Sequence, residues 1–462
     1  MVIKKKYIFF LILISFIVSI IVSINYVTKY DKITSDQRHG MIKDSIRGDW
    51  NKADKLNKVK TENFYNFFYK IGYDKPYLPP RTVALYYSLI NKDIKDQNNN
   101  FQVNDKKYFL LILQAFFYYM CLLFLSMVLL KRKENQNIIF FSILFLSLEP
   151  TILQWHSSFF TESIFFSLQI IVLAFFLKKD KKSSDYIFIG LFCGILLLQK
   201  SAGVYYPFII ISFLAITENF KKIKKILLVL MSYFLVCLFI GYTNYIRSNN
   251  FYFIPLQTKE AMFIYILPMI YQEKEKISFE AAQKKIIIKT ENWIKNNNVE
   301  AKITHNLFAY SFGSENDRIK IHTFQQELAF SEMKSNFFIT SKILINKYFH
   351  ALLINPVEIH YFYKYEWSDK YFQSYEHKKW IILRMFYTFL IYSICLYGLY
   401  VMFKEKKINK YNLFWLVSGF YFYLVLGWMG YTRYFTPVII YLSLFFATGI
   451  NQIIFNKKYT DQ

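Results

Sequence analysis

The sequence has few cysteines and none of the short motifs that mark a metal centre or a nucleotide site. Four of its 462 residues are cysteine, and all four lie inside apolar segments without metal-ligand spacing. They are interpreted as small buried apolar side chains. No glycine-rich phosphate loop, low-complexity stretch or internal repeat is evident. These absences exclude a cysteine-ligated metal centre and leave a nucleotide site without support.

Acidic residues are also scarce: 32 Asp and Glu stand against 57 Lys and Arg, a formal net charge of +25. The excess is not accompanied by a nucleic-acid-binding motif, so no nucleic-acid partner is expected. Instead, the basic residues gather at the ends of apolar segments, as they do in cytoplasmic loops of membrane proteins. These clusters are Lys4-Lys5-Lys6, Lys131-Arg132-Lys133 and Lys457-Lys458, with further ones at 178–182, 221–225 and 404–407.

Apolar residues are abundant, at 54% of the chain, and occur in blocks close to the ~20 residues that cross a bilayer as a helix. The pattern predicts an all-α polytopic membrane protein with about ten transmembrane helices. The first block is interpreted as a retained span, since its apolar run is long for a signal peptide and no small-residue cleavage site follows. Pro150 is expected to kink the third span. The expected spans are 7–27, 108–130, 137–155, 161–177, 186–200, 203–218, 226–246, 380–403, 411–429 and 436–455.

Alternating the spans from a cytoplasmic N-terminus places every basic cluster in the cytoplasm, together with the C-terminus. The protein is therefore expected in the cytoplasmic (inner) membrane. Two long polar segments, 28–107 and 247–379, then lie on the outer side. This divides the chain into an N-terminal membrane module (1–246), an extracytoplasmic segment (247–379) and a C-terminal membrane module (380–462).

Helices are also expected in the two outer segments. In the first, 36–44 and 51–69 have helical character, before Pro76, Pro79 and Pro80 break it. In the second, 279–297 and 337–353 are expected to be amphipathic helices, with aromatic faces that lie on the membrane surface or on the bundle.

Ionisable side chains near membrane depth are costly and are therefore candidates for function. They are Glu149, Glu162, Lys200, Arg384 and Arg433, with His156 beside them. Four of these residues, Glu162, Lys200, Arg384 and Arg433, have a structural alternative. Glu162 can simply favour a helix N-terminus, where its charge complements the helix dipole. Lys200 and Arg384 can extend toward the membrane surface.

Arg433 and Asp36 are expected at the outer face. A guanidinium at position 433 can hold a phosphate through two parallel hydrogen bonds, or it can be an interfacial anchor beside Tyr431 and Tyr434. Asp36, about nine residues after the first span, is placed to act as a general base. Its alternatives are a solvated loop carboxylate or a helix N-cap.

The order of these residues resembles the GT-C superfamily of membrane glycosyltransferases, in particular the bacterial branch related to protein mannosyltransferases and aminoarabinose transferases. The resemblance covers roughly 1–220 and 380–455. The family often has Asp-Glu or Asp-Asp where this chain has Asp36-Gln37. The matching elements are Asp36-Gln37, the proline-rich 75–80, Pro150 with Thr161-Glu162, Gly190 and Gly194 before Lys200, and Arg433-Tyr434 with Pro437.

The resemblance implies a function: inverting transfer of a sugar from a polyprenyl-phosphate lipid to an acceptor hydroxyl at the outer membrane face. Asp36 would be the catalytic base, and Arg433, with Lys200, would neutralise the leaving phosphate. Gln37, His156, Glu162, Lys200, Arg433 and Tyr434 are the expected substrate-binding residues. No cofactor is expected, and a divalent metal is not implied. The acceptor is a glycan, a lipid or a protein.

Two other functions remain open. An O-antigen polymerase or ligase also has many spans and a large outer loop, although these enzymes more often depend on outer-loop arginines. A lipid or polysaccharide transporter is the second alternative, but transporters tend to show repeats in two halves, which are not evident here.

Overall fold

The computed structural model describes residues 3–31, 106–156, 162–218, 223–254, 257–303, 310–352, 375–428 and 432–455. The ten apolar segments expected from the sequence are largely helical, and the third of them contains two helices, α6 and α7. The helices are α1 (Lys5–Asp31), α5 (Lys106–Lys131), α6 (Gln136–Leu148), α7 (Pro150–His156), α8 (Glu162–Leu177), α9 (Ser183–Gln199), α10 (Tyr206–Thr217), α11 (Ile223–Ser248), α19 (Tyr375–Lys404), α20 (Lys410–Gly427) and α21 (Thr432–Phe455).

Five of these helices are long and apolar enough to cross a membrane among the residues that the structure describes: α1, α5, α11, α19 and α21. The apolar helices α6, α8, α9 and α10 are shorter, at 10–17 residues in length. The structure therefore supports an all-α membrane protein, whereas the count of ten spans stays a prediction. The division of the chain at residues 247 and 380 also stays a prediction.

The third apolar segment is broken and not merely kinked. Helix α6 ends at Leu148, and α7 begins at Pro150. Between them, Glu149 has an extended backbone, with φ −59° and ψ 123°. The residue before a proline is pushed out of the helical region by the proline ring, which explains the break. As a result, the chain changes direction before it reaches His156.

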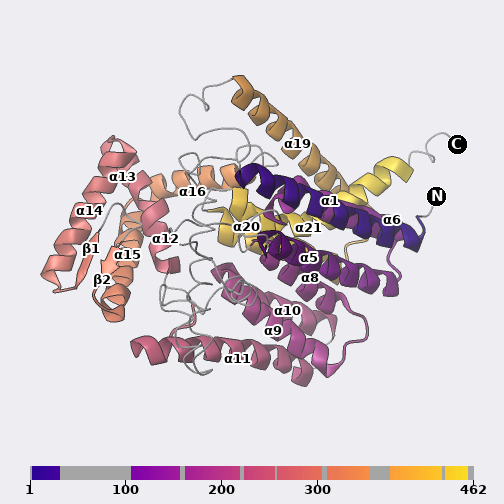
Figure 1. Ribbon diagram of the computed structural model, residues 1–462, viewed down its shortest axis with the longest axis horizontal. Coiled ribbons are helices and arrows are strands. Elements are labelled where there is room, and N and C mark those ends of the chain that lie inside the picture. The colour runs from indigo at the N-terminus through magenta and orange to yellow at the C-terminus, as the bar shows by residue number, and fades with distance from the viewer. Residues whose placement is uncertain are drawn as a thin grey trace.

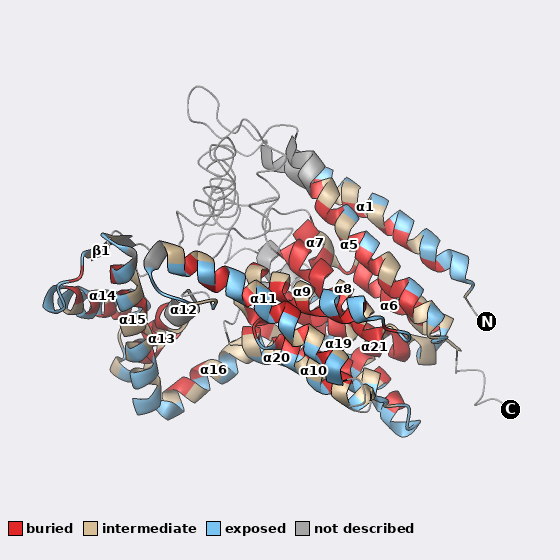
Figure 2. Ribbon diagram, turned by 90° about the horizontal axis from the view of Figure 1, so that it is seen from below, coloured by how far each residue is buried: buried red, intermediate tan, exposed pale blue. Residues whose placement is uncertain are grey.

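Helix α8 forms the centre of the bundle, with most of its residues buried on every side. Figure 2 shows this concentration of buried residues, and it shows exposed residues on the outer helices, for example along α1. The exposed side chains of the outer helices are large and apolar, for example Phe10 on α1, Met231 on α11 and Phe389 on α19. Such faces suit contact with lipid chains.

Glycines bring two helix pairs into close contact. A Cβ atom on Gly190 of α9 would lie 2.2 Å from the carbonyl oxygen of Val229 on α11. Likewise, a Cβ atom on Gly398 of α19 would lie 2.0 Å from the carbonyl oxygen of Phe445 on α21. Small residues allow this backbone approach and are common between membrane helices.

Residues 257–352 form a second group of elements, which lies at the left of Figure 1. It has its own apolar core around Phe263, Leu267 and Ile286. The expected amphipathic helices are confirmed as α14 and α16, and α16 leads back to the bundle. The elements are α12 (Gln257–Tyr265), α13 (Leu267–Glu275), α14 (Phe279–Asn296), β1 (Ala301–Ile303), β2 (Tyr310–Phe312), α15 (Glu315–Ser335) and α16 (Phe337–Leu352).

The two short strands are antiparallel, with Ala301 paired to Phe312, and were not predicted from the sequence. At three residues each they are too short to show a period-two pattern. The expected helices at 36–44 and 51–69 lie outside the described residues.

Candidate functional site

The candidate site is centred on an ion pair between α8 and the end of α9. Nζ of Lys200 lies 2.8 Å from Oε1 of Glu162, and the two side chains are 11% and 0% exposed. The ammonium of Lys200 also lies 5.5 Å from the centre of the Phe165 ring. Lys200 therefore points into the bundle and does not extend toward its surface. Two residues separated by 37 others in the chain thus form one charged unit in an apolar interior.

Local structure explains the positions of the two partners. Glu162 is in the first turn of α8, where a carboxylate complements the positive end of the helix dipole. Lys200 is the C-cap of α9, with φ −148° and ψ 135°, and its N–H still donates to the carbonyl of Leu196. This extended backbone ends the helix and turns the side chain toward α8. Glu162 can therefore both stabilise the start of α8 and take part in the site.

His156 joins the same site at the end of α7. Its Nδ1 lies 2.8 Å from Oγ of Ser163, the residue after Glu162. The imidazole is fully buried, with the ring of Tyr118 4.3 Å away between centroids. Among the described residues, no group hydrogen-bonds to its Nε2. His156 thus has one ring nitrogen held by α8 and one that is buried without a hydrogen-bond partner among the described residues.

The start of α21 reaches the same end of the bundle. The indole N–H of Trp155 donates to Oγ1 of Thr436 at 3.2 Å. Thr436 stands three residues after Arg433, so about one helical turn separates them. The backbone of Arg433 and Tyr434 therefore begins α21 beside α7. The side chains of both residues lie outside the described part of the structure, as do Asp36 and Gln37 entirely.

The burial of Glu149 is explained by the hydrogen bonds of its carboxylate. Its carboxylate accepts hydrogen bonds from the backbone N–H of Ile152 and the hydroxyl of Thr151, both at 3.0 Å. It also accepts from the hydroxyl of Tyr387 on α19, at 3.3 Å. Glu149 thus adds side-chain hydrogen bonds to the start of α7 and links that helix to α19. The backbone of Arg384 is helical, within α19, and its side chain is not among those described.

The sequence did not indicate the tyrosine that positions the turn after Lys200. The hydroxyl of Tyr421, on α20, donates to the carbonyl of Ala202 and accepts from the N–H of Tyr205. A third helix thereby fixes the connection that carries Lys200. With 39 tyrosines in the chain, composition gives no means of singling out this one.

The described part of the site offers a buried cation, a carboxylate and an imidazole at the end of an apolar bundle. Such a group can bind an anionic ligand in a setting of low dielectric, where charge interactions are strong. Within the described ranges, no group of three or more His, Cys, Asp or Glu side chains could hold a metal ion.

Residues 104–305 match the model of a family described as a predicted membrane protein (DUF2142). The matched region contains His156, Glu162 and Lys200, and excludes Asp36 and Arg433. No curated protein matches the chain. Together with the apolar helices, the family match shows a membrane protein with transmembrane helices.

Proposed function

We propose that the protein is a membrane glycosyltransferase, which transfers a sugar from a polyprenyl-phosphate lipid to an acceptor hydroxyl at the outer membrane face. The observation that carries this proposal is the buried Glu162–Lys200 pair beside His156. Charges placed inside an apolar bundle are costly and mark substrate sites by default. A lipid phosphate is the kind of anion for which a buried lysine is suited.

The proposed orientation has ten spans, with both chain termini in the cytoplasm. The N–H of Ile3 donates to Oδ1 of Asn137, and the rings of Phe141 and Phe455 lie 6.3 Å apart. Both chain ends therefore lie near the start of α6. Arg132, from a basic cluster, donates to the carbonyl of Leu177 at the same end of the bundle. This clustering supports a cytoplasmic assignment for that end by the positive-inside rule, with the Glu162–Lys200 pair at the opposite end.

The proposed reaction is a single displacement at the anomeric carbon. Asp36 removes the proton of the acceptor hydroxyl, whose oxygen forms the new bond to that carbon. The bond to the phosphate oxygen breaks, and its electron pair leaves with the lipid phosphate. Attack opposite the leaving group inverts the configuration. Arg433 and Lys200 stabilise the phosphate charge, and Glu162 holds Lys200 in place.

The remaining predicted residues bind substrate in this scheme. His156 offers Nε2 to a sugar hydroxyl or to phosphate. Gln37 and Tyr434 complete the binding residues, next to Asp36 and Arg433 in the sequence.

The test compares cell-envelope glycans of the producing cell with and without the gene, after complementation by variants. Wild-type protein should restore the missing glycan signal. Arg433→Gln should not restore it, whereas Arg433→Lys should restore part of it, because a point charge remains but the bidentate geometry is lost. Equal protein levels in the membrane fraction are the control. Full restoration by both Arg433→Gln and Asp36→Ala would overturn the mechanism.

A further inference from the structure

A cavity lies at the other end of the bundle, the end that carries the chain termini. Its volume is about 530 Å³, and it is lined by residues at the ends of α5, α6, α19, α20 and α21. Ile139, Met402 and Leu444 contribute apolar surface, and Asn135, Lys407 and Asn451 contribute polar groups. The cavity therefore has the mixed lining of a site for an amphiphile. The glycosyltransferase proposal does not use it.

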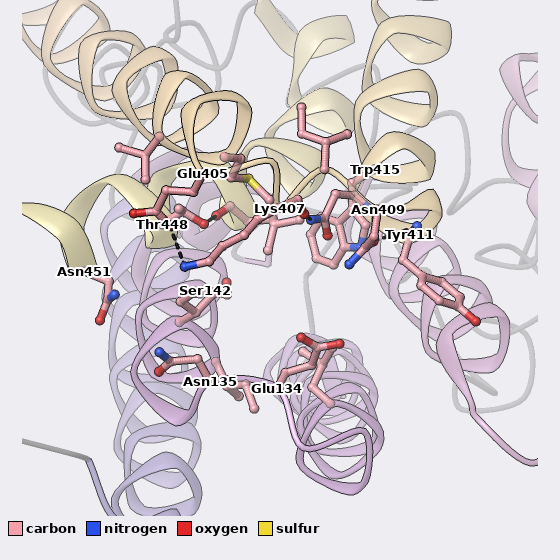
Figure 3. Close-up of a pocket in the computed structure, with 18 of the residues that line it drawn as sticks. Glu134, Asn135, Ser142, Glu405, Lys407, Asn409, Tyr411, Trp415, Thr448 and Asn451 are labelled. Carbon is pink, nitrogen blue, oxygen red and sulfur yellow. Dashed lines mark hydrogen bonds and ion pairs between the residues drawn. The ribbon is translucent and has the colours of Figure 1, made fainter.

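The polar side of the cavity contains the starts of two helices. Asn135 precedes α6, and its side chain accepts from the N–H of Asn137. Asn409 precedes α20 and accepts from the N–H groups of Tyr411 and Asn412. Figure 3 shows Asn135 with Glu134 on one side of the cavity and Lys407 with Asn409 on the opposite side. Two helix N-termini, each capped by its asparagine side chain, thus face one space, and their dipoles favour an anion.

Three cationic side chains and two carboxylates line the cavity. Arg132 is occupied, since it pairs with Glu134 at 3.3 Å and lies 3.8 Å from the centre of the Tyr411 ring. Lys407 pairs with Glu405, but its side chain is 69% exposed. Lys406 is exposed beside it. These two lysines are able to turn toward a bound anion. Lys407 would then exchange the carboxylate of Glu405 for an oxygen of the anion.

Asn451 is among the residues that line the cavity. Oδ1 of Asn451 is buried, and no described group hydrogen-bonds to it. If the side chain rotates, this oxygen can accept a hydrogen bond from a hydroxyl group of a ligand in the cavity. An anionic phosphate with neighbouring hydroxyls and apolar chains combines all the required groups.

We propose that this cavity binds the phosphate headgroup of an anionic phospholipid from the membrane leaflet on the side of the chain termini. Basic pockets between membrane helices commonly hold such headgroups. The phosphate lies between the two helix N-termini and the lysine pair, a headgroup hydroxyl donates to Asn451, and the acyl chains leave toward the surrounding lipid.

Thermal unfolding of the full-length protein in micelles of a short-chain phosphatidylcholine, titrated with phosphatidylglycerol, tests the proposal. Phosphatidylglycerol should raise the unfolding temperature of the wild type in a saturable way, because it binds the folded state. The double variant Lys406→Gln/Lys407→Gln should need an about thirtyfold higher lipid concentration, which corresponds to roughly 1 kcal/mol for each lysine. Asn451→Leu should weaken the response as well.

Lys404→Gln is the matched control. Lys404 belongs to the same basic cluster but does not line the cavity, and it should respond like the wild type. An equal loss in Lys404→Gln would show general surface attraction and overturn the proposal. So would an equal response to inorganic phosphate alone, since the lipid would then not be the ligand. An unchanged titration in the double variant would also refute it.

Discussion

Glu162 and Lys200 form a buried ion pair of 2.8 Å that joins the first turn of α8 to the end of α9. Removal of one partner leaves the other charge in an apolar interior. Removal of both takes away the charge altogether. The two residues should therefore behave as one unit in any measurement of stability.

The first prediction follows from this coupling. Lys200→Met should destabilise the protein strongly, on the scale of about 3–5 kcal/mol measured for breaking buried pairs, because the buried carboxylate of Glu162 then loses the neighbouring charge of Lys200. The double variant Glu162→Gln/Lys200→Met should recover much of that loss. Thermal unfolding of the three variants in detergent gives the comparison. Strictly additive effects of the two single substitutions would contradict the coupling.

A second prediction concerns the contact between α9 and α11. At Gly190 a Cβ atom would lie 2.0 Å from Oγ of Ser232 and 2.2 Å from the backbone oxygen of Val229. Since a backbone atom cannot rotate away, Gly190→Ala should separate the helices and cost about 1–3 kcal/mol. Gly419→Ala is the control, because its nearest neighbour, Cβ of Tyr441, is 3.0 Å away. Equal unfolding temperatures for the two variants would show that the close approach is unimportant.

A third prediction concerns pH and the group of elements at 257–352. Partial burial would raise the pKa of Glu332, but the hydrogen bond from Tyr271 and the charges of Lys289 and Lys274 outweigh it and lower that pKa below 4.5. The hydroxyl of Tyr271 lies 2.6 Å from Oε1 of Glu332. The folded state thus favours the carboxylate form, and its stabilisation is present above pH 4.5. It is lost as the pH falls through the folded-state pKa.

The measurement is the difference in unfolding temperature between the wild type and Glu332→Gln. This difference should be clear at pH 7 and should shrink as the pH falls below about 4.5. Glu291→Gln, at an exposed position on α14, should differ little from the wild type at either pH. A difference for Glu332→Gln that does not change with pH would refute the assignment.

The helices were largely predictable, because the length of an apolar run sets the length of a helix that lies in lipid. The expected span 108–130 corresponds to α5, and 436–455 corresponds to most of α21. The break at Glu149 was anticipated only as a kink: the pattern of residues located Pro150 but not how far the backbone departs from a helix there.

The candidate site was only partly predictable. The sequence supplied Glu162 and Lys200 as separate costly charges, but their contact depends on how α8 packs against α9. Nothing in the sequence singled out Tyr421 or the cavity near Lys407. Both depend on how helices that are distant in the chain pack against one another. The roles of Asp36 and Arg433 stay predictions, since the geometry of their side chains is not described.

Transfer activity itself tests the central claim most directly. Membranes from cells that lack the gene, supplemented with wild-type or variant protein, are given a panel of polyprenyl-phosphate lipids with radiolabelled sugars. Label should pass from one of these donors to the membrane acceptor with wild-type protein and with the control variant Asp44→Asn. With Asp36→Asn the rate should fall about a hundredfold or more, as expected for loss of a general base. Wild-type rates for Asp36→Asn at equal protein levels, or no transfer from any donor by the wild type, would contradict the account.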